Sequence, residues 1–474
     1  MRNIAIVGAG QAGLLTAHAL RQRGYDVTLF SDKSPEDFLL KSRPTGTAAR
    51  FDMALQWERE LGLNYWDHLA PQGQGVHLTF TPGGLGNVLL TLLGRLTRPF
   101  LAIDLRLQSH RWMLDLEKQG GKIVIEDVSV EALERIAADH DLTIVAAGRG
   151  PIMKLFPRDP ERSVYSRPPR FLAMVNVVGI PIRLDYCPFL PVKFNFFGRY
   201  GECFWVPWFH KDLQPAWSLV FEAKEGSPMD QFRDVRSGGE ALQIAKKVAR
   251  EMVPWDAHWM QGAELADENS WLVGSFIPEV RKTVGILPSG RAVMSVGDTN
   301  QSLDPIGGQG ANNGSKMARN LVDCIIERGD QPFDREWIAG TFEKFWRRHL
   351  WIDKFNNTLL EPLTDPGKEL LIAQYGSSGL KSDHSGRQAI ADAFIENFND
   401  PMLITDAFHD MRQARDLITR LTGRNWVWSA LRGRIAIAGG QLRQKMGMNP
   451  RHPGTEPIYS LRSRGAPKAG QAHG

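Results

Sequence analysis

The chain of 474 residues has few cysteines, no long apolar run and little excess of either charge. Its three cysteines, Cys187, Cys203 and Cys324, are far apart and form no Cys-x-x-Cys or Cys/His pattern, which speaks against a disulfide framework and a structural zinc site. No apolar run reaches the roughly 20 residues needed to cross a bilayer. We therefore expect no metal, no membrane insertion and a reducing, cytoplasmic location.

The charge balance also excludes a class of partner. Lys and Arg number 57 against 53 Asp and Glu, and several of the surplus basic residues lie in residues 449–474. The rest of the chain is nearly neutral, so we expect no nucleic-acid partner. With 42% hydrophobic and 23% charged residues, the composition is that of a globular protein of two or three domains.

The first informative pattern is a glycine-rich turn near the N-terminus. Residues 3–30 are predicted to form a strand, a turn, a helix and a second strand, which is a βαβ unit of a parallel sheet. The turn reads Gly-x-Gly-x-x-Gly, which allows a tight bend, close approach of a pyrophosphate and close helix packing, with phosphates held at the helix N-terminus. The predicted dinucleotide-binding residues are Gly8, Gly10, Gln11, Ala12 and Gly13.

An acidic residue at the end of the second strand normally binds the adenosine ribose hydroxyls of such a dinucleotide. Asp32 lies 19 residues after Gly13 and is our candidate. Ser31 occupies the position where flavoproteins more often have glutamate, so both Ser31 and Asp32 are kept as predicted cofactor contacts.

A second glycine-rich segment follows a predicted strand that ends at Val296. An aspartate there can accept hydrogen bonds from sugar-alcohol hydroxyls, and the glycines present backbone N–H groups at the start of a helix predicted from about residue 309 to 327. An enzyme that binds only NAD has no need of this second segment, so the pair of motifs predicts FAD. The predicted contacts are Asp298, Pro305, Gly307, Gly308, Gln309, Gly310, Ala311 and Asn312.

The pattern along the chain predicts an α/β fold. We expect a Rossmann-like FAD-binding domain in two parts, with an inserted antiparallel β-sheet substrate domain between them and a helical C-terminal region after them. The expected bounds are 1–169 and 291–330 for the FAD-binding domain, 170–290 for the β-rich domain, 331–448 for the helices and 449–474 for a flexible tail.

The β-rich segment is also rich in aromatic residues, which alternate along its predicted strands. Such residues can line an apolar pocket above a flavin, or they can form the core of the sheet, and for any single residue the core is the simpler explanation. As a group they favour an apolar or aromatic substrate. Phe196, Trp205 and Trp208 are the pocket candidates.

The two glycine motifs resemble those of the FAD-binding aromatic hydroxylase superfamily, which has the hydroxybenzoate hydroxylase fold. Segments 26–32, 49–61, 357–359 and 393–399 are similar to the oxygenase component of styrene/indole monooxygenases. The resemblance implies a flavin-dependent monooxygenase that inserts one atom of O2 into an alkene or aromatic ring through a C4a-(hydro)peroxyflavin. Because the flavin carries that chemistry, no catalytic side chain is assigned.

The sequence departs from this family at two positions near the expected flavin. Gly46 precedes Thr47 where the styrene enzymes have asparagine, and Arg50 stands where they have histidine. Gly46 and Thr47 are further pocket candidates, while Arg43 and Arg106 are predicted cofactor contacts. The chain beyond about Arg424 also extends further than the family leads us to expect.

The chain contains no Asp-Gly dipeptide. Single-component hydroxylases of the superfamily carry such a motif, associated with both FAD and NAD(P)H, so its absence favours a separate NAD(P)H–flavin reductase. Three alternatives stay open: a flavin-dependent halogenase, which would need a lysine between flavin and substrate, a single-component NAD(P)H-dependent hydroxylase, and a non-catalytic FAD-binding protein. A homodimer also stays open.

Overall fold

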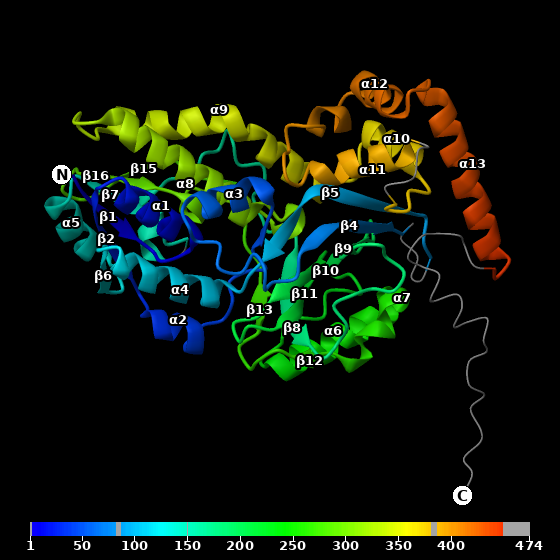
Figure 1. The fold of residues 1–474 in the computed structure, drawn as a ribbon, viewed down its shortest axis with the longest axis horizontal. Helices are drawn as coiled ribbons and strands as arrows, with labels where there is room; N and C mark the ends of the chain where they lie inside the picture. The colour runs from blue at the N-terminus through cyan, green and yellow to red at the C-terminus, as the bar shows by residue number, and fades with distance from the viewer. Residues whose placement is uncertain (1, 82–86, 149, 381–385, 449–474) are drawn as a thin grey trace, which may run out of the picture.

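The computed structural model describes residues 2–81, 87–148, 150–380 and 386–448, so the expected tail lies outside the described residues. The molecule is elongated along one axis, with a parallel sheet at its N-terminal end and a larger sheet further along. Long helices run over both parts (Figure 1). The α/β fold class predicted from the sequence is confirmed.

The first sheet has six strands. Its order is β15 (Val284–Ile286), β16 (Ala292–Ser295), β7 (Leu142–Val145), β1 (Asn3–Val7), β2 (Asp26–Ser31) and β6 (Lys122–Ile125). All neighbouring pairs are parallel except β15 and β16. The predicted βαβ unit is present, and the strand predicted before the second glycine segment returns to this sheet as β16.

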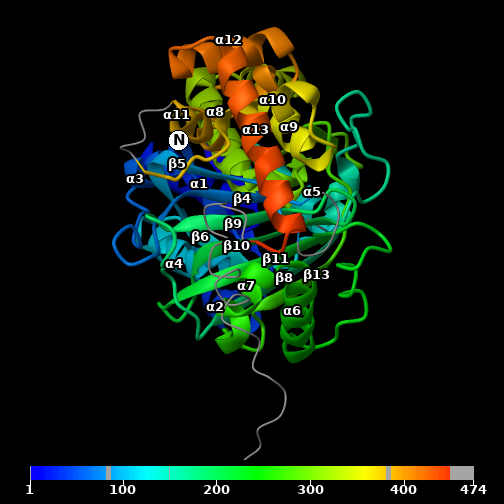
Figure 2. The ribbon, with the colours of Figure 1, turned by 90° about the vertical axis from the view of Figure 1, so that its right-hand side faces the viewer.

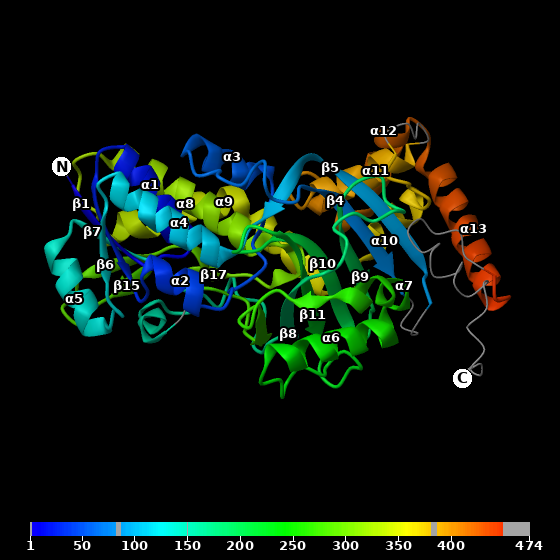
Figure 3. The same ribbon diagram turned by 60° about the horizontal axis from the view of Figure 1, so that its bottom comes forward.

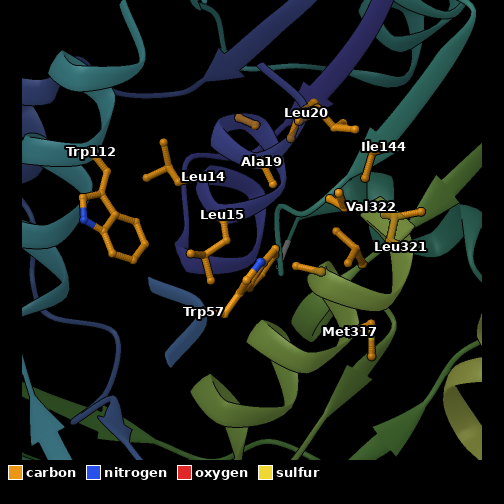
Figure 4. Packing of buried hydrophobic residues seen from close by; sticks show 14 of the residues in the cluster. Leu14, Leu15, Ala19, Leu20, Trp57, Trp112, Ile144, Met317, Leu321 and Val322 are labelled. Atoms are coloured by element: carbon orange, nitrogen blue, oxygen red, sulfur yellow. The ribbon is translucent and has the colours of Figure 1, made fainter. Parts of the chain in front are cut away.

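Alternating side chains of β1 explain the two layers on this sheet. Ile4 and Ile6 pack with α1 (Gln11–Gln22), α4 (Leu105–Lys118) and α8 (Gln309–Arg328), whereas Ala5 and Val7 pack with α5 (Val130–Asp139). Figure 4 shows the first layer: Leu15 of α1 lies beside Trp57, and Leu321 of α8 lies on the other side of Trp57. This packing presses α1 and α8 against each other.

The second sheet has nine strands, in the order β12 (Glu264–Leu265), β8 (Phe171–Val178), β11 (Pro215–Ala223), β10 (Gly201–Phe209), β9 (Pro191–Phe196), β4 (Gly73–Phe80), β5 (Leu90–Ala102) and β3 (Ala49–Arg50), with β13 (Trp271–Gly274) also on β8. Strands β3, β4 and β5 come from within residues 1–169, which the sequence assigned to the FAD-binding domain. Residues 73–102 therefore pair with strands of the β-rich segment and not with the parallel sheet. The parallel pairing of β4 with β9 joins segments more than 100 residues apart, so no hairpin signal marks it.

The two faces of this sheet contact different layers. On one face, helices α6 (Gly238–Met252) and α7 (Pro254–Ala257) cover the sheet (Figure 3). Cys203, Trp205 and their neighbours pack in the core on this face. On the other face, Phe204, Val206 and Trp208 join the core formed with the C-terminal helices. Residues that alternate along β10 therefore lie in separate cores.

The C-terminal region is helical, as predicted. Its helices are α9 (Arg335–Leu360), α10 (Asp365–Gln374), α11 (Arg387–Glu396), α12 (Met411–Thr422) and α13 (Trp426–Lys445). The side chain of Thr364 accepts a hydrogen bond from the backbone N–H of Gly367 and so caps α10. Two shorter helices, α2 (Pro35–Lys41) and α3 (Asp52–Glu60), and the strand pair β14 (Glu279–Val280) and β17 (Gln301–Ser302) complete the regular elements used below.

Two sequence expectations concern the chain as a whole. All three cysteines are unpaired thiols. Among the helices of the described ranges, none combines the length and apolarity that a membrane crossing requires.

Candidate functional site

The turn between β1 and α1 is closed on one side and open on the other. Gly8 has φ of +116°, and a Cβ there would lie 2.6 Å from the carbonyl oxygen of Ala146. A Cβ on Gly13 would lie 2.1 Å from the carbonyl oxygen of Gly8. Around a Cβ built on Gly10, by contrast, the described chain places no heavy atom within 4 Å. Only Gly10 therefore faces space that a ligand could fill.

The N-terminus of α1 also has the electrostatic character of an anion site. Gly10 is its N-cap residue, no side chain caps the helix, and the first turn contains no acidic residue. The first N–H groups of a helix have no partner within the helix and lie at the positive end of its dipole. This end of α1 thus suits a pyrophosphate.

The N-terminus of α8 repeats this arrangement. Its N-cap residue, Gly308, has φ of +59°, no side chain caps it, and its first turn also lacks acidic residues. Gly310 faces open space, whereas a Cβ on Gly307 would lie 2.4 Å from Oδ1 of Asn356. Asn356 is fully buried, and neither its amide nitrogen nor its amide oxygen has a partner among the described residues. A buried unsatisfied amide beside an open glycine turn suits a polar ligand.

The structure brings these two turns together although about 300 residues separate them. Nε2 of Gln11 donates hydrogen bonds to the carbonyl oxygen of Ala311, at 3.1 Å, and to Oγ of Ser315, at 2.7 Å. Cβ atoms added to Gly297 and Gly314 would lie 2.9 and 3.6 Å from Cβ of Ala12. The two predicted glycine motifs thus form one site, with two uncapped helix ends and two open glycines.

Polar residues predicted for the cofactor lie at the edge of this site. Asp32 is exposed at the end of β2 and pairs with Lys33 at 3.0 Å. The hydroxyl of Ser31 is buried and donates to the carbonyl oxygen of Lys33, so Asp32 is the more accessible of the two. Asp298 is exposed, and its Cβ would lie 3.6 Å from a Cβ on Gly148, at the end of β7.

The side chains of Gln309 and Asn312 form internal contacts. Gln309 donates to the carbonyl oxygens of Gly307 and Phe398, both at 2.8 Å. Asn312 donates to the carbonyl oxygen of Ala49 and accepts from the backbone N–H of Phe51, so it holds β3 against the start of α8. Pro305 opens the short turn before Gly308, where Asp304 accepts from the N–H of Ile306. These side chains hold the second glycine turn in place through contacts within the protein.

The two predicted arginine contacts each have a partner within the protein. Arg106 is buried and donates to Asp104 and Asp267, at distances down to 2.7 and 2.8 Å. Burial alone would raise the pKa of Asp267, but hydrogen bonds from His210, Arg106 and Ser270 lower it well below its ordinary range. Arg106 thus links α4 to the second sheet. Arg43 lies 3.9 Å above the ring of Trp271 in β13.

The segment with the two family departures lies between the glycine turns and the second sheet. Oγ1 of Thr47 is 3.0 Å from Oγ of Ser218 in β11 and 3.7 Å from the sulfur of Met174 in β8. Ala48 adopts φ of +51°, which is unfavourable for a residue with a side chain and is often found at functional sites. A Cβ on Gly46 would meet open space. Gly46 and Thr47 therefore lie where a substrate could reach both the sheet and the glycine turns.

Of the three aromatic pocket candidates, Phe196 and Trp208 lie on the same face of the sheet as Thr47's partner Ser218, and Trp205 lies on the opposite face. Trp208 is fully buried, and its indole N–H has no partner among the described residues. Phe196 stacks on Phe80 and Phe194. Trp205 instead donates to Oδ2 of Asp256 at 2.6 Å, beneath α6.

The position of one buried lysine bears on the halogenase alternative. Lys193 in β9 is opposite Trp205 in the sheet register and pairs with Asp256. It therefore faces the α6 side of the sheet and not the side of the glycine turns. Lys193 does not supply the lysine that a halogenase needs between flavin and substrate.

The sequence interpretation missed a group of buried charges beside the second glycine turn. Glu202 pairs with Arg170 at 2.7 Å, while Glu222 and Asp304 are fully buried and lie in contact with each other. Burial, together with the charges of Asp304 and Glu202, raises the pKa of Glu222 well above its ordinary value, and burial raises that of Asp304. One of these two carboxyl groups therefore keeps a proton. The only feature of the sequence that could have indicated this group of charges was the acidic residue directly before Pro305.

This pair predicts how stability depends on pH. Above the ordinary carboxyl pKa, folded Glu222 keeps a proton that the unfolded chain releases, so the pair costs more stability as the pH rises towards the folded pKa. Glu222→Gln removes this cost. The variant is therefore expected to gain stability relative to the original chain as the pH rises from about 5 to about 8, measured as the urea midpoint.

The matched control is Glu202→Gln, which leaves the buried Arg170 without its charged partner and is expected to destabilise the protein over the same pH range. A difference between Glu222→Gln and the original chain that does not change with pH would contradict the shared proton.

Comparisons with known proteins agree with this arrangement. Residues 148–258 match the family model described as the substrate-binding domain of styrene monooxygenase A, and residues 6–35 match the NAD(P)-binding Rossmann-like domain. Styrene monooxygenases of Pseudomonas fluorescens and of a second Pseudomonas are each 28% identical over 414 residues, covering 86% of this chain and 95% of the relative.

Solved structures with low sequence identity share the fold. A flavoprotein/dehydrogenase from Cytophaga hutchinsonii aligns with a TM-score of 0.58 at 13% identity, over 86% of this chain and 98% of that one. A variant of halogenase PltM in complex with FAD aligns with a TM-score of 0.58 at 13% identity, over 98% and 95%. The joined glycine turns and the relatives that align along most of the chain lead to one conclusion: this protein is a styrene monooxygenase-like, flavin-dependent monooxygenase.

Proposed function

We propose that the chain is the FAD-using oxygenase of a two-component system, which inserts one oxygen atom of O2 into an apolar alkene or aromatic substrate. The observation that carries the proposal is the meeting of two uncapped helix ends, α1 and α8, beside the loop of Thr47. Two such ends suit the pyrophosphate and the ring of one flavin dinucleotide. A separate NAD(P)H–flavin reductase is supported by the missing Asp-Gly motif.

Different residues would bind different parts of FAD. The N–H groups beside Gly10 would bind the pyrophosphate, Asp32 the ribose hydroxyls, and Asp298 the ribityl chain. The N–H groups at the start of α8 would face the carbonyl edge of the flavin ring and stabilise negative charge there. Reduced FAD, when bound, supplies two electrons and the activation of O2, so that one oxygen atom enters the substrate and the other leaves as water.

The second sheet would supply the substrate side of the site. Phe196 and Trp208 lie on the sheet face where Thr47 contacts Ser218, and both are embedded in an apolar core. Such surroundings exclude water, which limits wasteful release of hydrogen peroxide, and they favour a ring or alkene over a charged substrate. The relatives are named as styrene monooxygenases, and we propose styrene-like and indole-like compounds as the substrate class.

The test supplies chemically reduced FAD without oxygen, then adds isotopically labelled O2 with styrene or indole. We expect one labelled oxygen atom in the product, little hydrogen peroxide, and no requirement for NAD(P)H in this assay. Gly10→Val is the control, because the same protein without bound flavin should give peroxide alone.

Each other outcome identifies an alternative. Oxidation of NAD(P)H by the purified chain alone would indicate a single-component hydroxylase. A product that carries halogen when halide is present would indicate a halogenase. Tight binding of FAD with peroxide as the sole product from every substrate would indicate a non-catalytic flavoprotein.

A further inference from the structure

Helix α13 carries an apolar stripe that faces outward. Trp428, Leu431, Ile435, Leu442 and Met446 are 67, 46, 64, 58 and 55% exposed. At about 100° per residue these positions fall within one narrow sector of the helix. Figure 2 shows α13 running along the outer side of the helical region, facing the viewer. Apolar side chains of this size seldom gather in solvent without a partner.

Packing on the opposite face fixes the stripe in this direction. Ala430 is 1% exposed, and a Cβ on Gly433 would lie 1.9 Å from the carbonyl oxygen of Ile372 in α10. Gly440 is also buried on that side. Small residues thus bring α13 close against the body of the protein, and the larger apolar side chains are left outside.

Basic residues border the stripe on both sides. With the same helical spacing, Arg432 and Arg443 lie along one edge and Arg434 and Lys445 along the other. Arg434 also pairs with Glu369 of α10 at 2.9 Å. Residues 417–455 contain no aspartate or glutamate, so no acid of the helix itself offsets this charge.

We propose that α13 attaches the protein to the surface of a bilayer that carries anionic lipid headgroups. An apolar stripe bordered by Lys and Arg, with a tryptophan on the apolar side, lies in the headgroup plane with its apolar side chains inserted and its basic side chains at the phosphates. A second copy of the helix is a poor partner, because pairing the stripes would bring rows of like charge together. This attachment does not depend on the oxygen chemistry proposed above.

The test measures co-sedimentation of the full-length protein with vesicles of phosphatidylcholine alone or with ~30% phosphatidylglycerol. We expect binding to the anionic vesicles that weakens at high salt. Ile435→Glu/Leu442→Glu should lower the partition coefficient at least about 100-fold, because it charges the inserted face. Arg424 is exposed just before the first residue of α13, and Lys445 is the last residue of the helix. Arg424→Gln/Lys445→Gln should lower the partition coefficient about 25-fold, at roughly fivefold for each basic residue near the surface.

The control is Ile125→Glu, which charges an exposed apolar side chain of β6 at the other end of the molecule and should bind like the original chain. Equal binding to both vesicle types, or no binding to either, would overturn the proposal. So would a dimer that dissociates in Ile435→Glu/Leu442→Glu during sedimentation velocity without vesicles, because the stripe would then be an interface between copies.

Discussion

Replacing Gly10 with valine is expected to raise the Kd for reduced FAD at least about 100-fold, a loss of about 2.7 kcal/mol, while the protein stays folded. A side chain at Gly10 meets no atom of the described chain within 4 Å, and its φ of −77° and ψ of 176° are open to valine. The isopropyl group would instead occupy the space in which a pyrophosphate must approach the N–H groups of α1. Flavin binding is measured by anaerobic fluorescence titration, and folding by the melting temperature.

Substitutions at two other glycines distinguish a loss of FAD binding from a loss of folding. Gly340 in α9 is exposed and also faces open space, so Gly340→Val makes the same chemical change outside the two glycine turns and should leave both quantities nearly unchanged. Gly13→Val should instead lower stability severely, because its Cβ would lie 2.1 Å from a carbonyl oxygen. If Gly10→Val bound reduced FAD with unchanged affinity, the pyrophosphate would not bind at this turn.

Replacing Arg50 with alanine is expected to destabilise the protein by about 3–5 kcal/mol, the usual cost of removing one partner of a buried ion pair. Arg50 and Glu58 are fully buried and 2.6 Å apart. Burial raises the pKa of Glu58, and the charge of Arg50 partly opposes this rise. Without Arg50 the carboxyl would be buried alone. The measurement is the free energy of unfolding in urea.

A second effect of this change should appear in the site. Nη1 of Arg50 donates to the carbonyl oxygen of Ala48 at 3.3 Å, so the arginine also helps to hold the unfavourable φ of Ala48 beside Thr47. Arg50→Met/Glu58→Leu removes both charges together and should recover most of the stability. It should not recover the coupling of oxygen consumption to product, because the contact with Ala48 is still missing.

The control for this prediction is Arg59→Ala, which removes two surface ion pairs made from α3, the helix that contains Glu58. Arg59 contacts Asp52 and Asp67 but is 38% exposed, and such pairs contribute about 1 kcal/mol or less. Losses of similar size for Arg50 and Arg59 would show that burial of the Arg50–Glu58 pair has no energetic consequence.

Elements with a local signal were predicted well from the sequence. The strand, helix and second strand predicted within residues 3–30 are present as β1, α1 and β2, and the strand predicted to end at Val296 is present as β16. Strands β4 and β5 were not placed in the second sheet, although their sequences are apolar. Their neighbour is chosen by parallel pairing of β4 with β9, and nothing near residue 73 in the sequence specifies that partner.

The candidate site divides in the same way. The glycine turns were predictable because a positive φ and an uncapped helix end are local properties of a few consecutive residues. The pairing of Arg106 with Asp267 and the contact of Glu222 with Asp304 were not, since each joins segments from different elements of the fold. Alternation along β10 indicated two faces, but only the packing of α6 decided that Trp205 lies away from Thr47.

The sequence by itself determined the parallel sheet, the two glycine motifs and the flavin class, because each depends on spacing within a short stretch of chain. The tertiary structure decided that the two motifs form one site, which charges are buried together, and which face of α13 remains exposed. Those features depend on contacts between residues up to about 300 positions apart. They are selected by the free energies of burial and pairing, which a local sequence pattern does not reveal.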